Sequence, residues 1–298
     1  MKNTFFALLG LLTVGLLPAQ ETNTQAAKAT ATPDDATLMR IERDAHSSLL
    51  LITAMVADTP MRMILDTGAT HTILHKESAN KLKKGVMWLD TSHLKFEGNT
   101  QQRPDMMVAD LQAGPGLAPR HLFAVLDLSA VRSMMGEEVD GIIGMDVLGS
   151  LPFTFDFKNR KYYWGTPENE VNLTPIRGKM ERGGRMMVQG TCGGKTLTML
   201  LDTGSAITRV NAPDWAPGTG NEVMARLGNV NTTTHSKVTE GKPGDIEVAK
   251  GIVLKNVVPL LDEPGFSVLL GLDALKDSVL IHLPTERSLY GEFFLAEP

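Results

Sequence analysis

Residues 49–70 read LLLITAMVADTPMRMILDTGAT, and the same pattern returns at residues 184–206 as GRMMVQGTCGGKTLTMLLDTGSA. In each stretch an apolar run meets a turn, and a second apolar run leads directly into Asp-Thr-Gly. Two short apolar runs around a turn are typical of a β-hairpin. A pattern that returns within one chain indicates a duplicated structural unit, which here is built from β-strands.

The repeat continues downstream of both Asp-Thr-Gly motifs. The segment VDGIIGMDVL at 139–148 corresponds to SVLLGLDAL at 267–275, and FTFDFKNRKYYWG at 153–165 aligns without a gap to VLIHLPTERSLYG at 279–291. Both members of the second pair place aromatic and aliphatic residues at alternating positions, which predicts strand, turn and strand. The duplication therefore covers most of the chain.

The composition agrees with a fold made of short strands. The chain has 298 residues with 28 glycines and 16 prolines, which favours many turns over long packed helices. This length is enough for two domains of ordinary size. We therefore predict an all-β, bilobal architecture with pseudo-two-fold symmetry, composed of a first lobe at 47–165, a linker at 166–180 and a second lobe at 181–298.

Asp66 and Asp202 each follow an apolar strand and precede Thr-Gly. A pseudo-two-fold packing of the two halves would bring both carboxyl groups to the interface. Two carboxyl groups within hydrogen-bond distance share one proton over a broad pH range. One then acts as a base and the other as an acid, which suits the activation of water against an amide carbonyl without a cofactor or metal. Thr67 and Thr203 are placed to bond across to the opposite loop.

The sequence resembles the pepsin and retropepsin superfamily of aspartic proteases, in a single-chain form with both halves fused. The resemblance rests on Asp66-Thr67-Gly68-Ala69 and Asp202-Thr203-Gly204-Ser205, and it is reinforced by Gly141-Ile142-Ile143-Gly144 and Leu269-Leu270-Gly271. It implies an acid-protease β-barrel in each half and an active-site loop around each aspartate. It also implies a short helix after each second glycine block, at Met145–Leu148 and Leu272–Leu275. The implied substrate is an extended polypeptide, bound by a monomer.

The resemblance further implies a β-hairpin flap over each half of the cleft. The candidates are Gly98-Asn99-Thr100 and Gly228-Asn229-Val230, which carry turn residues flanked by strand-like segments. The alternative is an ordinary surface hairpin at each position. Neither segment contains the tyrosine that is usual in a pepsin flap, so the chain is more similar to retropepsin and related bacterial proteins.

The two active-site loops differ in one residue that bears on the carboxyl groups. Gly68 is followed by Ala69, whereas Gly204 is followed by Ser205. A hydroxyl at this position can donate a hydrogen bond to the neighbouring carboxylate and favour its charged form. The hypothesis is that Asp202 ionises more readily and that Asp66 holds the shared proton.

The N-terminus has the pattern of an export signal. Lys2 precedes an uncharged apolar run from Phe5 to Leu17, and this arrangement predicts a signal peptide at residues 1–19. Residues 20–46 are poor in large apolar side chains at their start and are expected to form a flexible segment. The mature protein is thus expected in the periplasm or outside the cell, with no membrane span.

Charge and cysteine content exclude several other functions. The net charge is −5, which does not provide the basic surface that nucleic acids require. Cys192 is the only cysteine, so neither an internal disulfide nor a cysteine-based metal cluster can form. His71 and His75 are four residues apart, but they follow a turn and lack an acidic third ligand, so no metal site is assigned. His282 is expected to face solvent from a strand.

The predicted function is that of an aspartic endopeptidase. Two alternatives remain open from the sequence. One is a non-catalytic peptide-binding envelope protein that retains the protease cleft. The other is a structural envelope protein, which would explain the repeat but not the paired aspartates.

Overall fold

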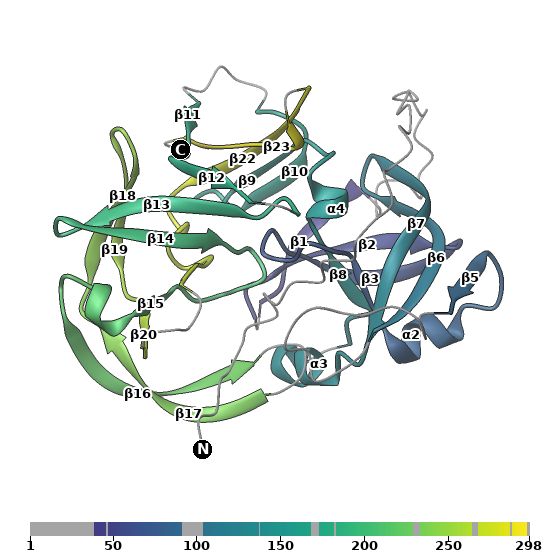
Figure 1. Ribbon diagram of the computed structural model, residues 1–298, viewed down its shortest axis with the longest axis horizontal. Coiled ribbons are helices and arrows are strands. Elements are labelled where there is room, and N and C mark those ends of the chain that lie inside the picture. Colours follow the sequence, from purple (N-terminus) through teal and green to yellow (C-terminus); the bar gives the residue numbers. More distant parts are fainter. Residues whose placement is uncertain are drawn as a thin grey trace.

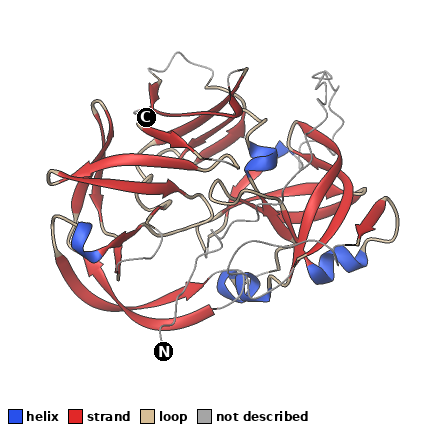
Figure 2. Ribbon diagram, in the orientation of Figure 1, coloured by secondary structure: helices blue, strands red, loops and turns tan. Residues whose placement is uncertain are grey.

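A computed structural model describes residues 39–45, 47–90, 104–136, 138–167, 173–181, 183–228, 233–263, 268–286 and 288–296. The predicted signal peptide, the flap candidates Gly98 and Asn99, and Asn229 lie outside these residues. Nearly all regular structure in the described chain is β-strand, with a few short helices (Figures 1 and 2). The predicted all-β class is confirmed. No helix in the described segments combines the length and apolar character that a membrane-spanning helix needs.

The first lobe is an eight-stranded sheet in the order β1-β2-β3-β8-β4-β7-β6-β5, and an additional β2–β6 pairing joins non-neighbouring strands of this order. Three short helices accompany its strands. The elements are β1 (Ile41–Arg43), β2 (Leu50–Val56), β3 (Thr59–Leu65), β4 (Ile73–His75), α2 (Lys76–Lys81), β5 (Val86–Leu89), β6 (Asp105–Ala113), β7 (Gly116–Leu126), α3 (Ser129–Met135), β8 (Gly141–Ile143) and α4 (Met145–Leu148).

The second lobe is a ten-stranded sheet in which β12 pairs with β13 beside the main path β16-β17-β20-β15-β21-β14-β13-β18-β19. Its elements are β12 (Gly178–Met180), β13 (Met186–Cys192), β14 (Lys195–Leu201), β15 (Arg209–Asn211), η1 (Ala212–Asp214), β16 (Thr219–Gly228), β17 (Thr233–Gly241), β18 (Gly244–Ala249), β19 (Ile252–Val257), β20 (Leu260–Asp262) and β21 (Leu269–Leu270).

The hairpins expected from the repeat are β2–β3 and β13–β14, which have equivalent turns. Ala57 and Asp58 form the first turn with φ of 45° and 62°, and Gly193 and Gly194 form the second with φ of 54° and 80°. Two consecutive residues with positive φ give a tight turn whose twist matches that of the flanking strands. Each hairpin therefore returns the chain directly along the strand that ends at the aspartate.

A third sheet joins the two halves of the chain. It has the order β10-β9-β22-β23-β11 and lies above both lobes in Figure 1. Phe153 and Phe155 stack in its core with ring centroids 4.5 Å apart, and both side chains are buried. The elements are β9 (Phe153–Asp156), β10 (Lys161–Trp164), β11 (Thr174–Pro175), β22 (Val279–Thr285) and β23 (Ser288–Ala296).

This architecture corrects three boundaries predicted from the sequence. The segment 20–46 is not flexible to its end, because Ile41 is buried and pairs with Ile52 in the first sheet. The linker 166–180 contributes β11 and β12 to two sheets. The repeat segments 153–165 and 279–291 do not remain in separate lobes, since β9 pairs with β22.

Two further expectations are wrong. Residues 272–275 form a turn, in which Leu275 N–H donates to Leu272 O, and only the first lobe has a helix at this place, α4. His282 does not face solvent: it is fully buried, stacks on Phe153, and has both ring nitrogens 2.8 Å from backbone carbonyl oxygens. Burial lowers the pKa of His282.

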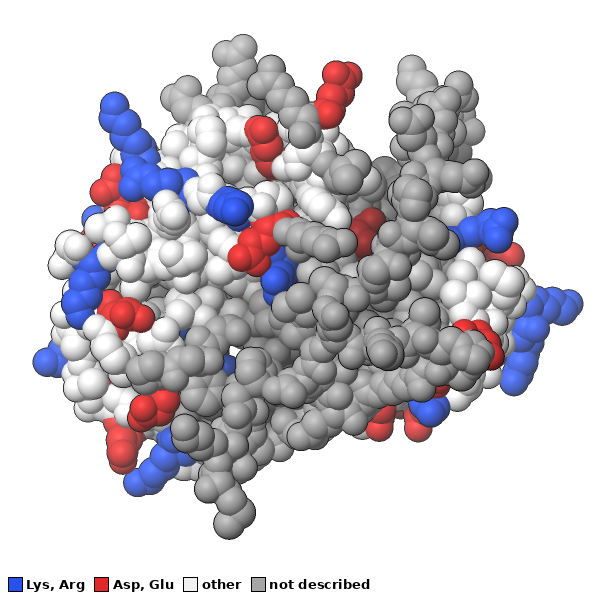
Figure 3. Space-filling model, viewed as in Figure 1, with Lys and Arg blue, Asp and Glu red and all other residues white. Residues whose placement is uncertain are grey.

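The surface carries both signs of charge. On the face shown in Figure 3, basic and acidic side chains alternate over the described surface instead of forming one basic stripe. This distribution agrees with the net charge of −5.

Candidate active site

The two Asp-Thr-Gly loops are held in equivalent positions of the two lobes. β3 runs parallel to β8, and the Asp66 N–H donates to the carbonyl oxygen of Ile143 at 3.0 Å. In the second lobe β14 runs parallel to β21, and the Asp202 N–H donates to Leu270 O at 3.1 Å. The apolar-apolar-Gly blocks seen in the sequence therefore support the strands that end at the aspartates.

Two threonines tie the loops to each other by reciprocal hydrogen bonds. The Thr67 hydroxyl donates to Leu201 O at 2.8 Å and accepts from Thr203 N–H at 3.1 Å. In the same way, the Thr203 hydroxyl donates to Leu65 O at 2.8 Å and accepts from Thr67 N–H at 3.0 Å. Both threonines are buried. The four bonds fix the two aspartates relative to one another across the interface of the halves.

Each glycine of the two motifs faces the carboxyl group of the opposite motif. A Cβ atom placed on Gly68 would lie 2.7 Å from Asp202 Cγ, and one on Gly204 would lie 2.5 Å from Asp66 Oδ2. Such distances are too short for non-bonded atoms. Glycine is thus required at both positions by the close approach of the opposite carboxyl group.

The environment raises the pKa of both aspartates. Burial is the main cause of the raised pKa of Asp66. The Gly68 and Ala69 N–H groups donate to its Oδ1 at 2.7 and 3.1 Å, and these hydrogen bonds partly offset the rise. Burial and the charge of Asp66 raise the pKa of Asp202 well above its usual value. Among the described residues, Oδ1 of Asp202 is buried without a hydrogen-bond partner. The pair therefore retains a shared proton.

This result corrects the sequence-based hypothesis about Ser205. Its hydroxyl donates to Ile207 O at 2.8 Å, so it is used within its own loop and does not favour the charged form of Asp202. The Ser205 hydroxyl therefore does not distinguish the two carboxyl groups in the way expected from Ala69 and Ser205.

A threonine and an aspartate behind each loop form a further support that was not predicted from the sequence. The Thr72 hydroxyl donates to Asp146 Oδ1 at 2.8 Å and accepts from Gly144 N–H at 3.2 Å. The Thr208 hydroxyl donates to Asp273 Oδ1 at 2.6 Å and accepts from Gly271 N–H at 3.1 Å.

A signal for these residues was present in the repeat. Thr72 and Thr208 each lie six positions after their catalytic candidate, and Asp146 and Asp273 each lie two positions after the glycine of the apolar block. Comparing polar residues at equal offsets would have identified all four. Burial raises the pKa of Asp273.

The remaining sequence candidates lie outside this geometry. Gly228 ends β16 and pairs with Thr233 in a hairpin, β16–β17, whose strands contact α3 of the first lobe. In Figure 1 this hairpin runs from the second lobe along the lower edge of the molecule. His75 is buried and its Nδ1 accepts from Leu128 N–H at 2.9 Å. No group of three metal-ligating side chains is present in the described residues.

Comparison with known proteins gives two matches. Residues 52–147 match the sequence profile of a family described as aspartyl protease. Among solved structures, basic 7S globulin from soybean has a similar fold, with 12% sequence identity and a TM-score of 0.50 over 87% of this chain and 94% of that chain. No curated protein sequence matches the chain.

The profile covers the first Asp-Thr-Gly loop and the strand β8 beside it, and the structural match covers both halves. The first finding rests on sequence and the second on fold alone, and the two agree with the duplicated motifs. The first half of the chain is therefore similar to aspartyl proteases in sequence, and the chain as a whole shares its fold with basic 7S globulin.

Proposed function

We propose that the protein is an aspartic endopeptidase in which Asp66 and Asp202 activate one water molecule. The observation that carries the proposal is the reciprocal threonine network, which holds the half-buried Asp66 and the buried Asp202 together across the two halves. Burying two adjacent carboxyl groups is unfavourable unless they share a proton. A site that maintains this arrangement in both halves is well suited to proton transfer.

We propose roles for the two aspartates from the hydrogen bonds that each carboxyl group makes. Asp66, whose Oδ1 accepts two backbone N–H groups, is the base that takes a proton from water. Protonated Asp202 donates to the carbonyl oxygen of the substrate amide. Water oxygen bonds to the carbonyl carbon and gives a tetrahedral intermediate. The C–N bond then breaks as the leaving nitrogen takes the proton that Asp66 received from water, and a hydroxyl of the intermediate returns a proton to Asp202. The products are one carboxylic acid and one amine.

The substrate, the oligomeric state and the location that we propose are those expected from the sequence. The substrate is an extended polypeptide lying between the lobes, and the β16–β17 hairpin is the flap candidate on the second lobe. The enzyme acts as a monomer, because both half-sites are in one chain. We propose that it acts after export, in the periplasm or outside the cell.

The alternative is a peptide-binding protein that retains the cleft without hydrolysis. To separate the two, the purified protein is incubated with a peptide library from pH 3 to 8, and the cuts are mapped by mass spectrometry. Asp66→Asn and Asp202→Asn are compared with Asp58→Asn, which changes an exposed turn of hairpin β2–β3.

The proposal predicts cleavage by the wild type and by Asp58→Asn, and its loss in both active-site variants. Peptide binding without cleavage by folded wild-type protein would support the alternative. Cleavage that survives in either Asp66→Asn or Asp202→Asn would contradict the shared-carboxyl mechanism.

A further inference from the structure

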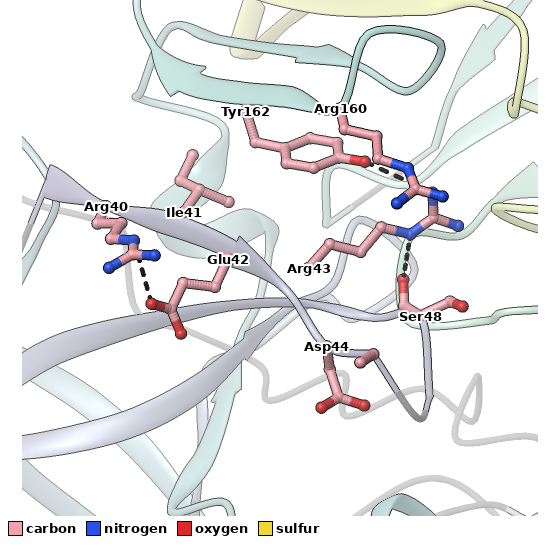
Figure 4. A pocket seen from close by; sticks show the side chains of 9 residues that line it. Arg40, Ile41, Glu42, Arg43, Asp44, Ser48, Arg160 and Tyr162 are labelled. Carbon is pink, nitrogen blue, oxygen red and sulfur yellow. Dashed lines mark hydrogen bonds and ion pairs between the residues drawn. The ribbon is translucent and has the colours of Figure 1, made fainter.

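A pocket separate from the aspartate pair lies where the first lobe meets the third sheet. It has a volume of about 680 Å³ and is lined by β1, the turn that follows β1, and the β9–β10 hairpin (Figure 4). None of these elements carries an active-site residue. The volume is within the range of small-molecule sites, roughly 300–1,000 Å³.

Three arginines and two acidic residues line this pocket, and the acidic ones are already used. Glu42 pairs with Arg40 at 3.1 Å. The Asp44 carboxylate turns to Ser47, whose N–H and hydroxyl lie 2.5 and 2.7 Å from Oδ2. Arg43 and Arg160 are therefore left without a carboxylate partner in the described part of the pocket.

The two remaining guanidinium groups converge on one corner of the pocket. Figure 4 shows Arg43 and Arg160 directed to the same region beside the Tyr162 hydroxyl. Arg43 is held there by its Nε, which donates to Ser48 O at 3.1 Å, while its Nη1 lies 3.5 Å from the Tyr162 oxygen. The Arg160 side chain is exposed and makes no hydrogen bond or ion pair with any described residue.

The charge of this corner indicates the kind of ligand. Two adjacent guanidinium groups carry two positive charges, which a single carboxylate would only half neutralise. A phosphate monoester carries close to two negative charges and accepts several hydrogen bonds from planar guanidinium groups. The pocket is larger than a phosphate group, and Ile41 and the Tyr162 ring provide apolar walls for an organic substituent.

We propose that this pocket binds a phosphate monoester of a small organic molecule, with Arg43, Arg160 and the Tyr162 hydroxyl around the phosphate. The bound ligand would join β1 of the first lobe to the β9–β10 hairpin of the third sheet. Binding is therefore expected to stabilise the native protein, because only the folded chain assembles these three groups.

The test is a calorimetric titration of the purified protein with inorganic phosphate and, separately, with glycerol 3-phosphate, at matched ionic strength in chloride. Thermal unfolding is followed under the same conditions. Arg160→Gln removes the unpaired guanidinium. Arg120→Gln is the matched control, because Arg120 is also an exposed arginine at positive φ, 52° against 55° for Arg160, and lies on β7 outside the pocket.

The expected result is saturable binding at one site per chain and a higher unfolding temperature with ligand. Arg160→Gln should weaken binding by about tenfold or more, and Arg120→Gln should bind as the wild type does. Tighter binding of glycerol 3-phosphate than of phosphate would show that the apolar walls take part. If phosphate binds equally well or better, the ligand is the free anion and the monoester assignment is wrong.

Absence of saturable binding with both compounds, or equal binding by Arg160→Gln and the wild type, would overturn the proposal. The readout does not depend on peptide hydrolysis. It therefore remains informative whatever the outcome for the aspartate pair.

Discussion

Gly204 faces the carboxyl group of Asp66 so closely that no side chain fits between them. Gly204→Ala is expected to displace the Asp66 carboxyl and to reduce kcat/KM by at least about 100-fold, the effect of a small misplacement of reacting groups. The activity of Gly204→Ala is compared with that of a control variant, Gly251→Ala, under the same conditions. Gly251 has a φ of 80°, and a Cβ placed on it would meet no atom within 4 Å. This control is therefore strained by about 1 kcal/mol but should keep full activity.

The proton shared by the aspartates also affects stability. The pKa of Asp202 is raised in the folded protein, so this carboxyl stabilises the fold below its unfolded pKa near 3.8, and that contribution is lost as the pH rises through the folded pKa. Asp202→Asn, which cannot ionise, should therefore be more stable than the wild type at pH 7. Each unit of raised pKa corresponds to about 1.4 kcal/mol.

The measurement for this prediction is urea unfolding at pH 7 and below pH 4. The stability gap between Asp202→Asn and the wild type should shrink at the lower pH, where the Asp202 carboxyl is neutral in the unfolded chain as well. Asp58→Asn should show no such change. A gap that widens on acidification would mean that Asp202 is stabilised in its charged form in the native state.

At the scale of the element, each active-site loop depends on a threonine behind it. Thr208 joins β21 to the second loop through Asp273 and Gly271. Thr208→Val keeps the shape of the side chain but leaves the half-buried Asp273 without one donor, so a loss of about 1–3 kcal/mol is expected. Thr198→Val, on an exposed position of β14, should cost less than about 0.5 kcal/mol.

Local sequence patterns predicted the elements around the two Asp-Thr-Gly motifs, because the same polar residues recur there at the same positions of both repeats. The hairpins before both aspartates and the cross-loop role of Thr67 and Thr203 followed from short-range sequence signals. The hydrogen bond of the Ser205 hydroxyl to Ile207 O was not predicted, because its direction depends on loop geometry that the sequence pattern does not encode. The turn at 272–275 was not predicted either, because its sequence is as apolar as that of the helix α4.

At the scale of the whole molecule, the third sheet makes the two halves interdependent. Phe155 of β9 pairs with Leu280 of β22, and both side chains are buried. Phe155→Ala should therefore destabilise the entire chain by about 3–5 kcal/mol. Unfolding followed by circular dichroism and by tryptophan fluorescence should give coincident transitions. Two separate transitions would show that the lobes fold independently.

The pairing of strands in this sheet does not follow from the repeat in the sequence. Segments 153–165 and 279–291 are equivalent repeats, so each was expected to lie in its own lobe. Their mutual pairing is a contact between distant parts of the chain, and strand patterns do not specify their partners. The position of His282 was missed for the same reason, since β9 and β23 cover it from both sides.

The central claim is that Asp66 and Asp202 act as one catalytic unit, and a double-mutant cycle on kcat/KM tests it most directly. The wild type, Asp66→Asn, Asp202→Asn and the double variant are compared on one cleavable peptide at the optimal pH. Residues that act together are strongly non-additive, so each single variant should lose nearly as much activity as the double variant. Losses that simply multiply would mean that the two aspartates work independently, and would contradict the account.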